Sequence, residues 1–378
     1  MDASKIKLEF NKQLNNFTKV NIMVVGGTGV GKSSLVNCVF GEDIARIGSG
    51  RPQTQGIDIY DNEKSPAVIF DTEGYEIFDG EIDNSNFQSV VLTEVTKRRT
   101  LELKDQIHLF WYCISVANHR ITEYDLQNIK ALKDIGVDLA IVLTKCDTEE
   151  VDENNEGVTS KAFKRMLREE GIKLNNIFET ISEGDDNLEL DQLIEWSVSR
   201  LTNDDLRASF VGAQKQSLKL KNKEANQIIN MTSVSAASAA GLNPLPTTDS
   251  AILMPLQIAL AVKLANIYGF TSMNDRVLDL MRTQVISLVG KQLASSLTKL
   301  VPVVGQVINA SVAGSLTLAL GHTLKQVYVS AYIGYLDTGK DPDWLSLFNE
   351  LNVDQLLVDY VKQAQLNKKN VDKDKKKK

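Results

Sequence analysis

The segment Gly26-Gly27-Thr28-Gly29-Val30-Gly31-Lys32-Ser33 decides how this chain folds. It fits the pattern GxxxxGK[ST], in which glycines let the loop curl so that its N–H groups point inward at a phosphate. The apolar run 21–25 precedes the loop, and Leu35 and Val39 follow it at helical spacing. The loop therefore opens a helix, whose N-terminus favours an anion. The segment predicts a phosphate-binding loop in an α/β domain.

The side chains of this loop have separate expected roles. Lys32 is expected to bridge the β- and γ-phosphates of a nucleotide and to act in catalysis, and the Ser33 hydroxyl is expected to bind Mg²⁺. The alternative is a glycine-rich turn with a solvent lysine, but all four specified positions match in the required context. The loop residues expected to contact the nucleotide are Gly26, Gly29, Gly31, Lys32, Ser33 and Ser34.

Two further motifs stand at the ends of apolar runs. Asp71 and Gly74 form a DxxG motif, in which the carboxylate is expected to hold a Mg²⁺-bound water and the Gly74 amide to face the γ-phosphate. Thr144, Lys145 and Asp147 form a TKxD motif. The Asp147 carboxylate can accept from the N1–H and the exocyclic amine of guanine, a donor pair that adenine lacks. With the stem of Lys145 along the base, this motif selects GTP.

Apolar runs alternate with amphipathic stretches from residue 18 to about residue 200. Runs rich in Val, Ile and aromatic residues favour strands, and apolar residues at 3.6-residue spacing favour helices. Strands that alternate with helices predict a mostly parallel sheet covered on both faces. The predicted strands are 20–25, 57–60, 67–70, 107–114, 139–143 and 177–181.

The three motifs, in this order and at strand ends, resemble those of the P-loop GTPases over residues 18–202. The resemblance implies a six-stranded sheet with GTP or GDP and Mg²⁺ at the C-terminal edge of the strands, and a switch between the two nucleotide states. GGTGVGKSS together with TKCD is most similar to the immunity-related and dynamin-like GTPases or to the Era-like bacterial group. Thr144 replaces the usual asparagine, as it does in dynamin-like relatives.

The same resemblance implies further site residues. Thr54, in the segment 51–56, is similar to the switch I threonine that binds Mg²⁺ and the γ-phosphate. Ser182 follows the sixth predicted strand, where the backbone of a serine usually contacts the guanine O6. An ordinary polar loop is the alternative interpretation of Thr54.

Two departures from relatives predict slow hydrolysis. Tyr75 stands where Ras-like proteins carry the water-orienting glutamine, and Gly29 stands where potassium-activated relatives carry an asparagine. Arg46 or Arg51 could then supply the transition-state cation, within one chain or across a G-domain homodimer. The alternative is that both arginines are solvated loop residues.

The composition of the sequence changes after about residue 205, where strand-like runs are followed by helical sequence rich in Ala, Leu, Ser and Gly. The expected organisation is a GTP-binding domain with an N-terminal helix at 1–204, a helical domain at 205–367 and a disordered lysine-rich tail at 368–378. Residues 230–335 resemble the domain of unknown function typified by YcjF, which implies a helical bundle often associated with membranes.

Composition excludes several classes of protein. The chain has 378 residues with a net charge of −7, and the tail 368–378 carries +5, which leaves −12 on the body. No nucleic-acid partner is expected, because phosphate contacts need clustered Lys and Arg. Three separated cysteines give no disulfide framework, three scattered histidines give no zinc site, and the first residues contain no signal-like apolar run. A cytoplasmic protein is therefore expected.

The sequence fits two interpretations of contact with an anionic membrane surface. Residues 300–324 carry no charge and are long enough to span a bilayer, but seven of them are polar. A tightly packed soluble hairpin and a peripheral membrane contact both fit this pattern. The lysine tail fits attraction to anionic lipid or a solubilising end.

Two functions of different classes follow. The first is an enzyme and switch, in which Mg²⁺-dependent GTP hydrolysis acts on the helical domain. The second is a GTP-controlled scaffold or membrane effector with negligible hydrolysis. The intact Lys32, Ser33 and Asp71 favour the first function, and Tyr75 together with Gly29 in place of asparagine favours the second.

Overall fold

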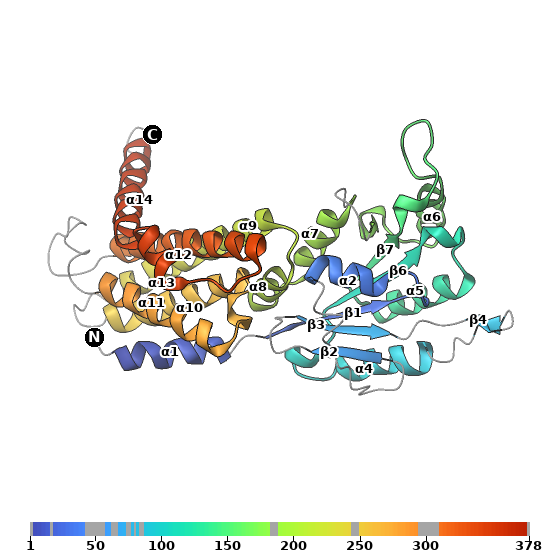
Figure 1. Ribbon diagram of the computed structural model, residues 1–378, viewed down its shortest axis with the longest axis horizontal. Helices are drawn as coiled ribbons and strands as arrows, with labels where there is room; N and C mark the ends of the chain where they lie inside the picture. The colour runs from blue at the N-terminus through green and yellow to red at the C-terminus, as the bar shows by residue number, and fades with distance from the viewer. Residues whose placement is uncertain are drawn as a thin grey trace. The chain divides into compact units, whose positions relative to one another are not determined.

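The chain forms two compact units in a computed structural model: the sheet unit, Thr18–Leu218, and the helical unit, Met1–Phe17 with Lys219–Lys378. Figure 1 shows the elements of each unit. The structure describes residues 3–15, 18–41, 57–61, 67–72, 77–78, 81–82, 87–181, 188–242, 249–293 and 310–375.

The sheet unit is built on a six-stranded sheet in the order β2-β3-β1-β6-β7-β8. Strand β2 pairs antiparallel with β3, and the other neighbours are parallel, so the mostly parallel sheet predicted from the sequence is confirmed. A separate hairpin of β4 (Ile77–Phe78) and β5 (Glu81–Ile82) was not predicted. The strands of the main sheet are β1 (Val20–Val25), β2 (Ile57–Asp61), β3 (Ala67–Thr72), β6 (Leu109–Ser115), β7 (Leu139–Thr144) and β8 (Ile177–Glu179).

Helices lie on both sides of this sheet (Figure 1). A π-helical segment, Phe87–Leu92, leads directly into α4. A capping box starts α5, in which Thr122 and Asp125 exchange side-chain and backbone hydrogen bonds. The helices of the unit are α2 (Lys32–Phe40), α4 (Thr93–Arg98), α5 (Glu123–Ile135), α6 (Val158–Glu169), α7 (Leu190–Arg200) and α8 (Asp204–Ala213).

Successive residues of β6 show how the two faces are covered. Phe110 and Tyr112 belong to a core cluster that includes residues of α4 and α5. Trp111 points the other way, where it stacks on Phe40 of α2 at 5.8 Å and meets Phe210 of α8 edge-on at 6.3 Å. Helix α8 is therefore part of the sheet unit, although the sequence placed residues from 205 onward in the helical domain.

The helical unit is entirely α-helical apart from one short 3₁₀ turn, within the residues that the structure describes. Its core holds an aromatic cluster, in which Phe270 meets Trp344 edge-on at 4.9 Å and Tyr328 packs against both. The helices are α1 (Ala3–Asn15), α9 (Leu218–Leu242), α10 (Asp249–Ile267), α11 (Asp275–Leu293), α12 (Ala310–Thr338), α13 (Trp344–Glu350) and α14 (Val353–Lys375).

Helix α1 packs on α10 and α11, and it buries Ile6 and Phe10. The structure thus groups it with the helical unit, whereas the sequence placed it in the domain at 1–204. An amphipathic pattern shows that a helix has an apolar face, but it does not say which partner covers that face.

Helix α14 continues to Lys375, so most of the tail expected to be disordered at 368–378 is helical. No helix in the described part of the chain has both the length and the hydropathy needed to cross a bilayer.

Candidate functional site

Three predicted motifs meet at one edge of the sheet. The strands β1, β3, β6 and β7 run parallel, so their carboxyl ends share that edge. The register pairs Val24 with Asp71 and Ser115 with Thr144. The glycine loop after β1, the DxxG motif and the TKxD motif therefore start side by side.

The loop after β1 requires glycine at specific positions. Gly26 has φ +146°, and a Cβ atom there would lie 2.3 Å from the carbonyl oxygen of Cys113 on β6. Gly29 and Gly31 also have positive φ, of 73° and 101°. Residues that carry a Cβ rarely adopt these backbone conformations, so the loop can curl only because these three residues are glycines.

Lys32 begins α2 and turns back into the loop. Its Nζ donates to the carbonyl oxygens of Gly26 and Gly27 at 3.0 and 3.1 Å, and the residue is only 8% exposed. Ser33 and Ser34 are exposed on the first turn of the same helix. A cation and hydroxyl groups thus stand at a helix N-terminus, where the helix dipole favours an anion.

The TKxD motif is hydrogen-bonded to the same loop. Thr144 donates its hydroxyl to the Val30 carbonyl, and Lys145 Nζ donates to the Gly29 carbonyl at 2.7 Å. Lys145 adopts a left-handed backbone with φ 59°, after which the chain turns. Thr144 and Lys145 therefore join the TKxD motif to the glycine loop.

This bonding pattern fits a phosphate ligand. Four loop carbonyls, of Gly26, Gly27, Gly29 and Val30, accept hydrogen bonds from lysine or threonine side chains. Carbonyl oxygens would repel a phosphate, and these donors offset that repulsion. The glycine-shaped cradle and Lys32 are therefore chemically suited to a nucleoside di- or triphosphate.

The residues that would hold Mg²⁺ are Ser33 and Asp71. The backbone of Asp71 lies near the carboxyl end of β3, at the same edge of the sheet as the glycine loop. No group of three or more His, Cys, Asp or Glu residues gathers anywhere in the described chain. Mg²⁺ typically keeps waters and shares substrate phosphates rather than needing a full protein cage, so Ser33 and Asp71 fit this mode of binding.

Asp147 lies exposed in the 3₁₀ turn Cys146–Thr148. Its neighbour Cys146 is buried and donates its backbone N–H to the Thr180 carbonyl at 3.2 Å. Burial raises the pKa of the Cys146 thiol to about 12, so the thiol is neutral and serves packing rather than chemistry. The hydrogen bond from Cys146 fixes the backbone of the turn to the residue after β8, and the Asp147 carboxylate stays exposed on this turn.

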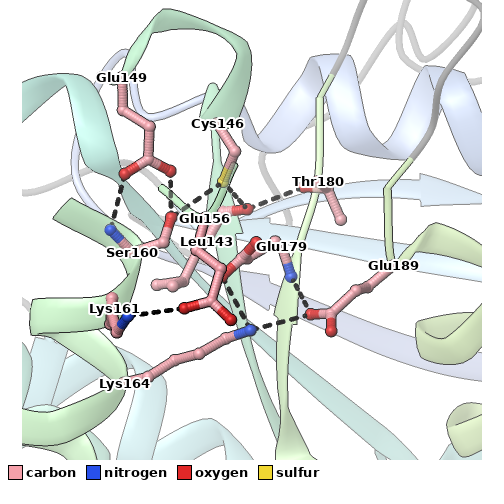
Figure 2. Close-up of polar contacts among 10 residues, drawn as sticks. All are labelled: Leu143, Cys146, Glu149, Glu156, Ser160, Lys161, Lys164, Glu179, Thr180 and Glu189. Carbon is pink, nitrogen blue, oxygen red and sulfur yellow. Dashed lines mark hydrogen bonds and ion pairs between the residues drawn. The ribbon is translucent and has the colours of Figure 1, made fainter. Parts of the chain in front are cut away.

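Sequence patterns missed the polar contacts behind this turn, which Figure 2 shows. The Glu149 carboxylate accepts from the Ser160 N–H at 2.7 Å and so ties the turn to α6. Lys164 of α6 lies 2.8 Å from Glu179 and 3.3 Å from Glu189. Charged residues on an amphipathic helix look like solvent-facing residues, so nothing in the spacing indicated these partners.

Several predicted site residues lie outside the described residues: Thr54, Gly74, Arg51 and Ser182, and with them Arg46 and Tyr75. The structure brings together Gly26, Gly29, Gly31, Lys32, Thr144 and Lys145 through contacts within or to the loop.

Comparisons with known proteins find matches to two separate parts of the chain. Residues 21–145 match the family model of the 50S ribosome-binding GTPase, and residues 207–336 match a domain of unknown function, DUF697. Neuronal-specific septin-3 of Bos taurus is 29% identical over 52% of this chain and 58% of its own length. The human septin-3 is 30% identical over 45% of this chain and 51% of its own.

Cell division control protein 10 of Candida albicans is 26% identical, over 46% of this chain and 53% of its own length. The chain thus spans only about half the length of these relatives. A crystal structure of a probable GTP-binding protein engB aligns with a TM-score of 0.35 and 15% identity, over 48% of this chain and 98% of that one.

Proposed function

We propose that this chain, in which residues 21–145 form a GTPase domain and residues 207–336 a DUF697 domain, binds GTP with Mg²⁺ and hydrolyses it slowly to GDP and phosphate. Loss of the γ-phosphate then releases the loops around Thr54 and Gly74 and acts on the helical unit. The activity is that of a conformational switch.

The contact between the TKxD motif and the glycine loop is the observation that carries this proposal. Thr144 and Lys145 bond to the carbonyls of Val30 and Gly29, so the residues proposed for guanine and those proposed for phosphate form one framework. A nucleotide is the ligand that has a base and a polyphosphate at this short distance from each other.

The side chains have these proposed roles. Lys32 exchanges its two loop carbonyls for β- and γ-phosphate oxygens and stabilises charge in the transition state. Ser33, Thr54 and Asp71 hold Mg²⁺, which supplies neutralisation of phosphate charge when bound. The Gly74 amide faces the γ-phosphate, and Arg51 supplies a further cation.

Base selectivity is contributed by Asp147, with Lys145 along the base and the Ser182 backbone at O6. Replacing Asp147 with Asn exchanges an acceptor for a donor, so preference should shift from guanine toward xanthine nucleotides. Titration calorimetry with GDP, XDP and ADP measures this, and Asp134→Asn, an exposed substitution on α5, is the control. Equal binding of GDP and ADP by the parent would refute guanine selectivity.

Phosphate binding is tested by Lys32→Ala, which should lower GTP and GDP affinity at least about tenfold, or 1.4 kcal/mol. Lys104→Ala is the control, because that lysine is exposed and pairs only with Glu102 among the described side chains. Unchanged GTP and GDP binding by the Lys32 variant would end the phosphate-loop interpretation.

Turnover should be slow, unaffected by exchange of Na⁺ for K⁺, and should rise with protein concentration if G domains pair. Arg51→Ala and Arg46→Ala should then reduce the turnover number more than the affinity, since a finger arginine acts in the transition state. Phosphate release at saturating GTP measures the turnover number of each variant. Full activity in both variants at high protein concentration would exclude these arginines as the cation.

A second candidate is a GTP-controlled effector at an anionic membrane surface, with negligible hydrolysis. One end of the helical unit favours it, because Ala236 and Ala240 of α9 cluster there with Leu253 of α10 and Ala313 of α12. Val234 and Met231 of α9 are 65% and 47% exposed. The helix halves that meet at this end carry no charged side chain: 225–242, 250–262 and 310–324.

Flotation with anionic vesicles tests this second candidate. An apolar contact and the lysine tail would act together, so binding should weaken with salt, on deletion of 368–378 and on Val234→Asp. The amount bound should also differ between a GTP analogue and GDP. A full-length protein that stays at the bottom of the gradient in both states at low salt excludes direct lipid binding.

A further inference from the structure

The loop 116–122 connects β6 to α5 at the edge of the sheet that carries the proposed nucleotide site. Strand β6 lies between β1, which precedes the glycine loop, and β7, which precedes the TKxD motif. Its last residue, Ser115, is in register with Thr144. The loop begins with the 3₁₀ turn Val116–Asn118, which lies next to the turn Cys146–Thr148. The loop therefore borders the proposed guanine motif.

Both ends of this loop are fixed. Val116 and Ile121 are buried in the core cluster that includes residues of α4 and α5. The His119 N–H donates to the Val116 carbonyl at 2.9 Å, and Thr122 forms the capping box of α5. Residues 117–120, between the two buried anchors, are all exposed. The loop thus holds a short projection at the nucleotide edge of the sheet.

Arg120 is the last residue of this projection. Its side chain makes no hydrogen bond, ion pair or ring contact with any residue that the structure describes. By contrast, Lys32 and Lys145 both donate to carbonyls of the glycine loop. The Arg120 guanidinium therefore keeps its five N–H donors for a ligand that carries negative charge.

Arg120 and the start of α2 belong to different sides of the sheet. Trp111 of β6 stacks on a ring of α2, so α2 and Lys32 at its start lie on that side. Val116 and Ile121, which flank the projection, pack on the opposite side with α4 and α5. A phosphate held by Lys32 and an anion held by Arg120 are therefore approached from different sides of the same edge.

We propose that Arg120 acts across a pair of sheet units and donates hydrogen bonds to the γ-phosphate of the GTP that a second copy binds. A two-fold contact through this edge places the loop of each copy against the site of the other. When water attacks the γ-phosphorus, the bond to the bridging oxygen of the β-phosphate breaks, and that oxygen keeps the electron pair as GDP leaves. The guanidinium stabilises the negative charge that develops on these oxygens.

This inference rests on the proposed function, because it requires that the chain hydrolyses GTP. It goes beyond the roles proposed for Arg46 and Arg51, since it makes the second copy the source of a catalytic residue. Hydrolysis is then fast only when two copies meet, and an isolated copy stays slow.

The fold does not depend on the Arg120 side chain, because that side chain is exposed and has no partner among the described residues. Arg120→Ala and Arg120→Lys should therefore keep the melting temperature of the parent. Arg168 of α6 is the matched control, since it is also exposed and its side chain also has no partner in the described part of the chain.

The first measurement is phosphate release by the full-length protein at saturating GTP over a range of protein concentrations. The turnover number of the parent should rise as copies pair. Arg120→Ala should lose this rise and should be about a hundredfold slower than the parent at the highest concentration. Arg120→Lys should lie between the two, because an ammonium keeps the charge without the planar fork. Arg168→Ala should match the parent throughout.

The second measurement identifies the copy that supplies the arginine. Arg120→Ala is loaded with GTP labelled in the γ-phosphate and mixed with an excess of parent protein loaded with a non-hydrolysable GTP analogue. Excess unlabelled analogue prevents released label from binding again. Only the labelled GTP on the variant can then be hydrolysed. The parent as donor should restore a rate close to that of the parent alone, whereas Arg120→Ala loaded with the analogue should not.

Three outcomes would overturn the inference. One is a parent-like rate for Arg120→Ala at high protein concentration. Another is a slow Arg120→Ala that the parent donor does not accelerate, which would mean that Arg120 acts within its own chain. The third is a parent whose turnover number does not depend on protein concentration, although it hydrolyses GTP. A parent that releases no phosphate from GTP would refute the proposed hydrolysis itself, which is a separate result.

Discussion

The two units hold a fully buried glutamine in opposite ways. Gln214 of the sheet unit donates to the Ser217 carbonyl at 3.0 Å and accepts from the Ser217 N–H at 2.8 Å. Gln257 of the helical unit makes one long contact, 3.4 Å to Thr317, and its Oε1 has no partner among the described residues. The sheet unit thus satisfies a polar group that the helical unit leaves partly unsatisfied.

The same contrast holds for buried lysines. Lys32 of the sheet unit bonds two carbonyls of a loop whose other carbonyls accept from Thr144 and Lys145. Lys221 of the helical unit is fully buried against the Ile267 carbonyl and the ring of Tyr332. Buried polar groups indicate a ligand site where they converge on one loop, and they indicate only packing where each meets a different helix.

Glycine substitutions give the largest expected difference between the units. A Cβ at Gly26 would meet a backbone oxygen at 2.3 Å with φ +146°, so Gly26→Ala should destabilise the sheet unit by about 3 kcal/mol. A Cβ at Gly321 of α12 would meet side-chain atoms of Ile229 at 2.8 and 2.9 Å. Gly321→Ala should cost only about 1 kcal/mol, because a side chain can shift and alanine favours the helix.

Denaturant unfolding of the full chain measures both changes, with the sheet-unit transition identified by its shift on adding GDP. Gly334→Ala is the control on α12, since open space surrounds that position, and it should be slightly stabilising. A Gly26→Ala protein as stable as the parent would show that the loop backbone is free to move, and the contrast would then fail.

The fold of the sheet unit was largely predictable from sequence because its strands are buried on both faces. Such strands appear as continuous apolar runs, and β1 covers the predicted residues 20–25. The glycine loop was predictable because φ values of 73° to 146° leave little choice of residue at Gly26, Gly29 and Gly31. The sequence could locate these features because a local backbone requirement fixes each of them.

Other features depend on contacts between distant residues, and spacing does not encode them. The helical segment 87–98 and the ion pairs of Lys164 with Glu179 and Glu189 escaped prediction, since a charged helix residue looks solvent-facing until its partners are placed. The assignment of α1 to the helical unit and the helical continuation of α14 to Lys375 escaped for the same reason.

Substitution of the two buried glutamines should change stability less than substitution of Gly26, and with opposite signs in the two units. Gln214→Met removes two good hydrogen bonds and leaves Ser217 groups unpaired, so it should destabilise the sheet unit by about 2 kcal/mol. Gln257→Met removes a buried acceptor without a partner, so it should stabilise the helical unit by about 1 kcal/mol. Unfolding transitions of both variants report the two signs. Destabilisation by Gln257→Met would show that this amide is satisfied in solution.

The smallest expected effect is a decrease in the stability of the sheet unit as the pH falls. In the sheet unit, His108 Nδ1 accepts from the Asn21 N–H at 2.8 Å, and Nε2 lies 2.8 Å from the Leu103 carbonyl. Burial lowers the pKa of His108, and in the helical unit burial together with the charge of Lys325 lowers that of His322. Protonation of His108 would replace the acceptor of the Asn21 N–H with a second N–H donor.

The direction of this change in stability follows from the pH at which the folded and unfolded states bind a proton. Histidine in the unfolded chain takes up its proton near pH 6.5, while folded His108 does so at lower pH, so the unfolded state gains stability as pH falls below about 6.5. Between about pH 7.5 and 5.5 the sheet-unit transition should drop by a few degrees. His108→Gln should reduce that drop, and His119→Gln, at an exposed position, should not. A drop of equal size in parent and His108→Gln would assign the acid sensitivity to other groups, and the contact between His108 and Asn21 would then be equally stable at both pH values.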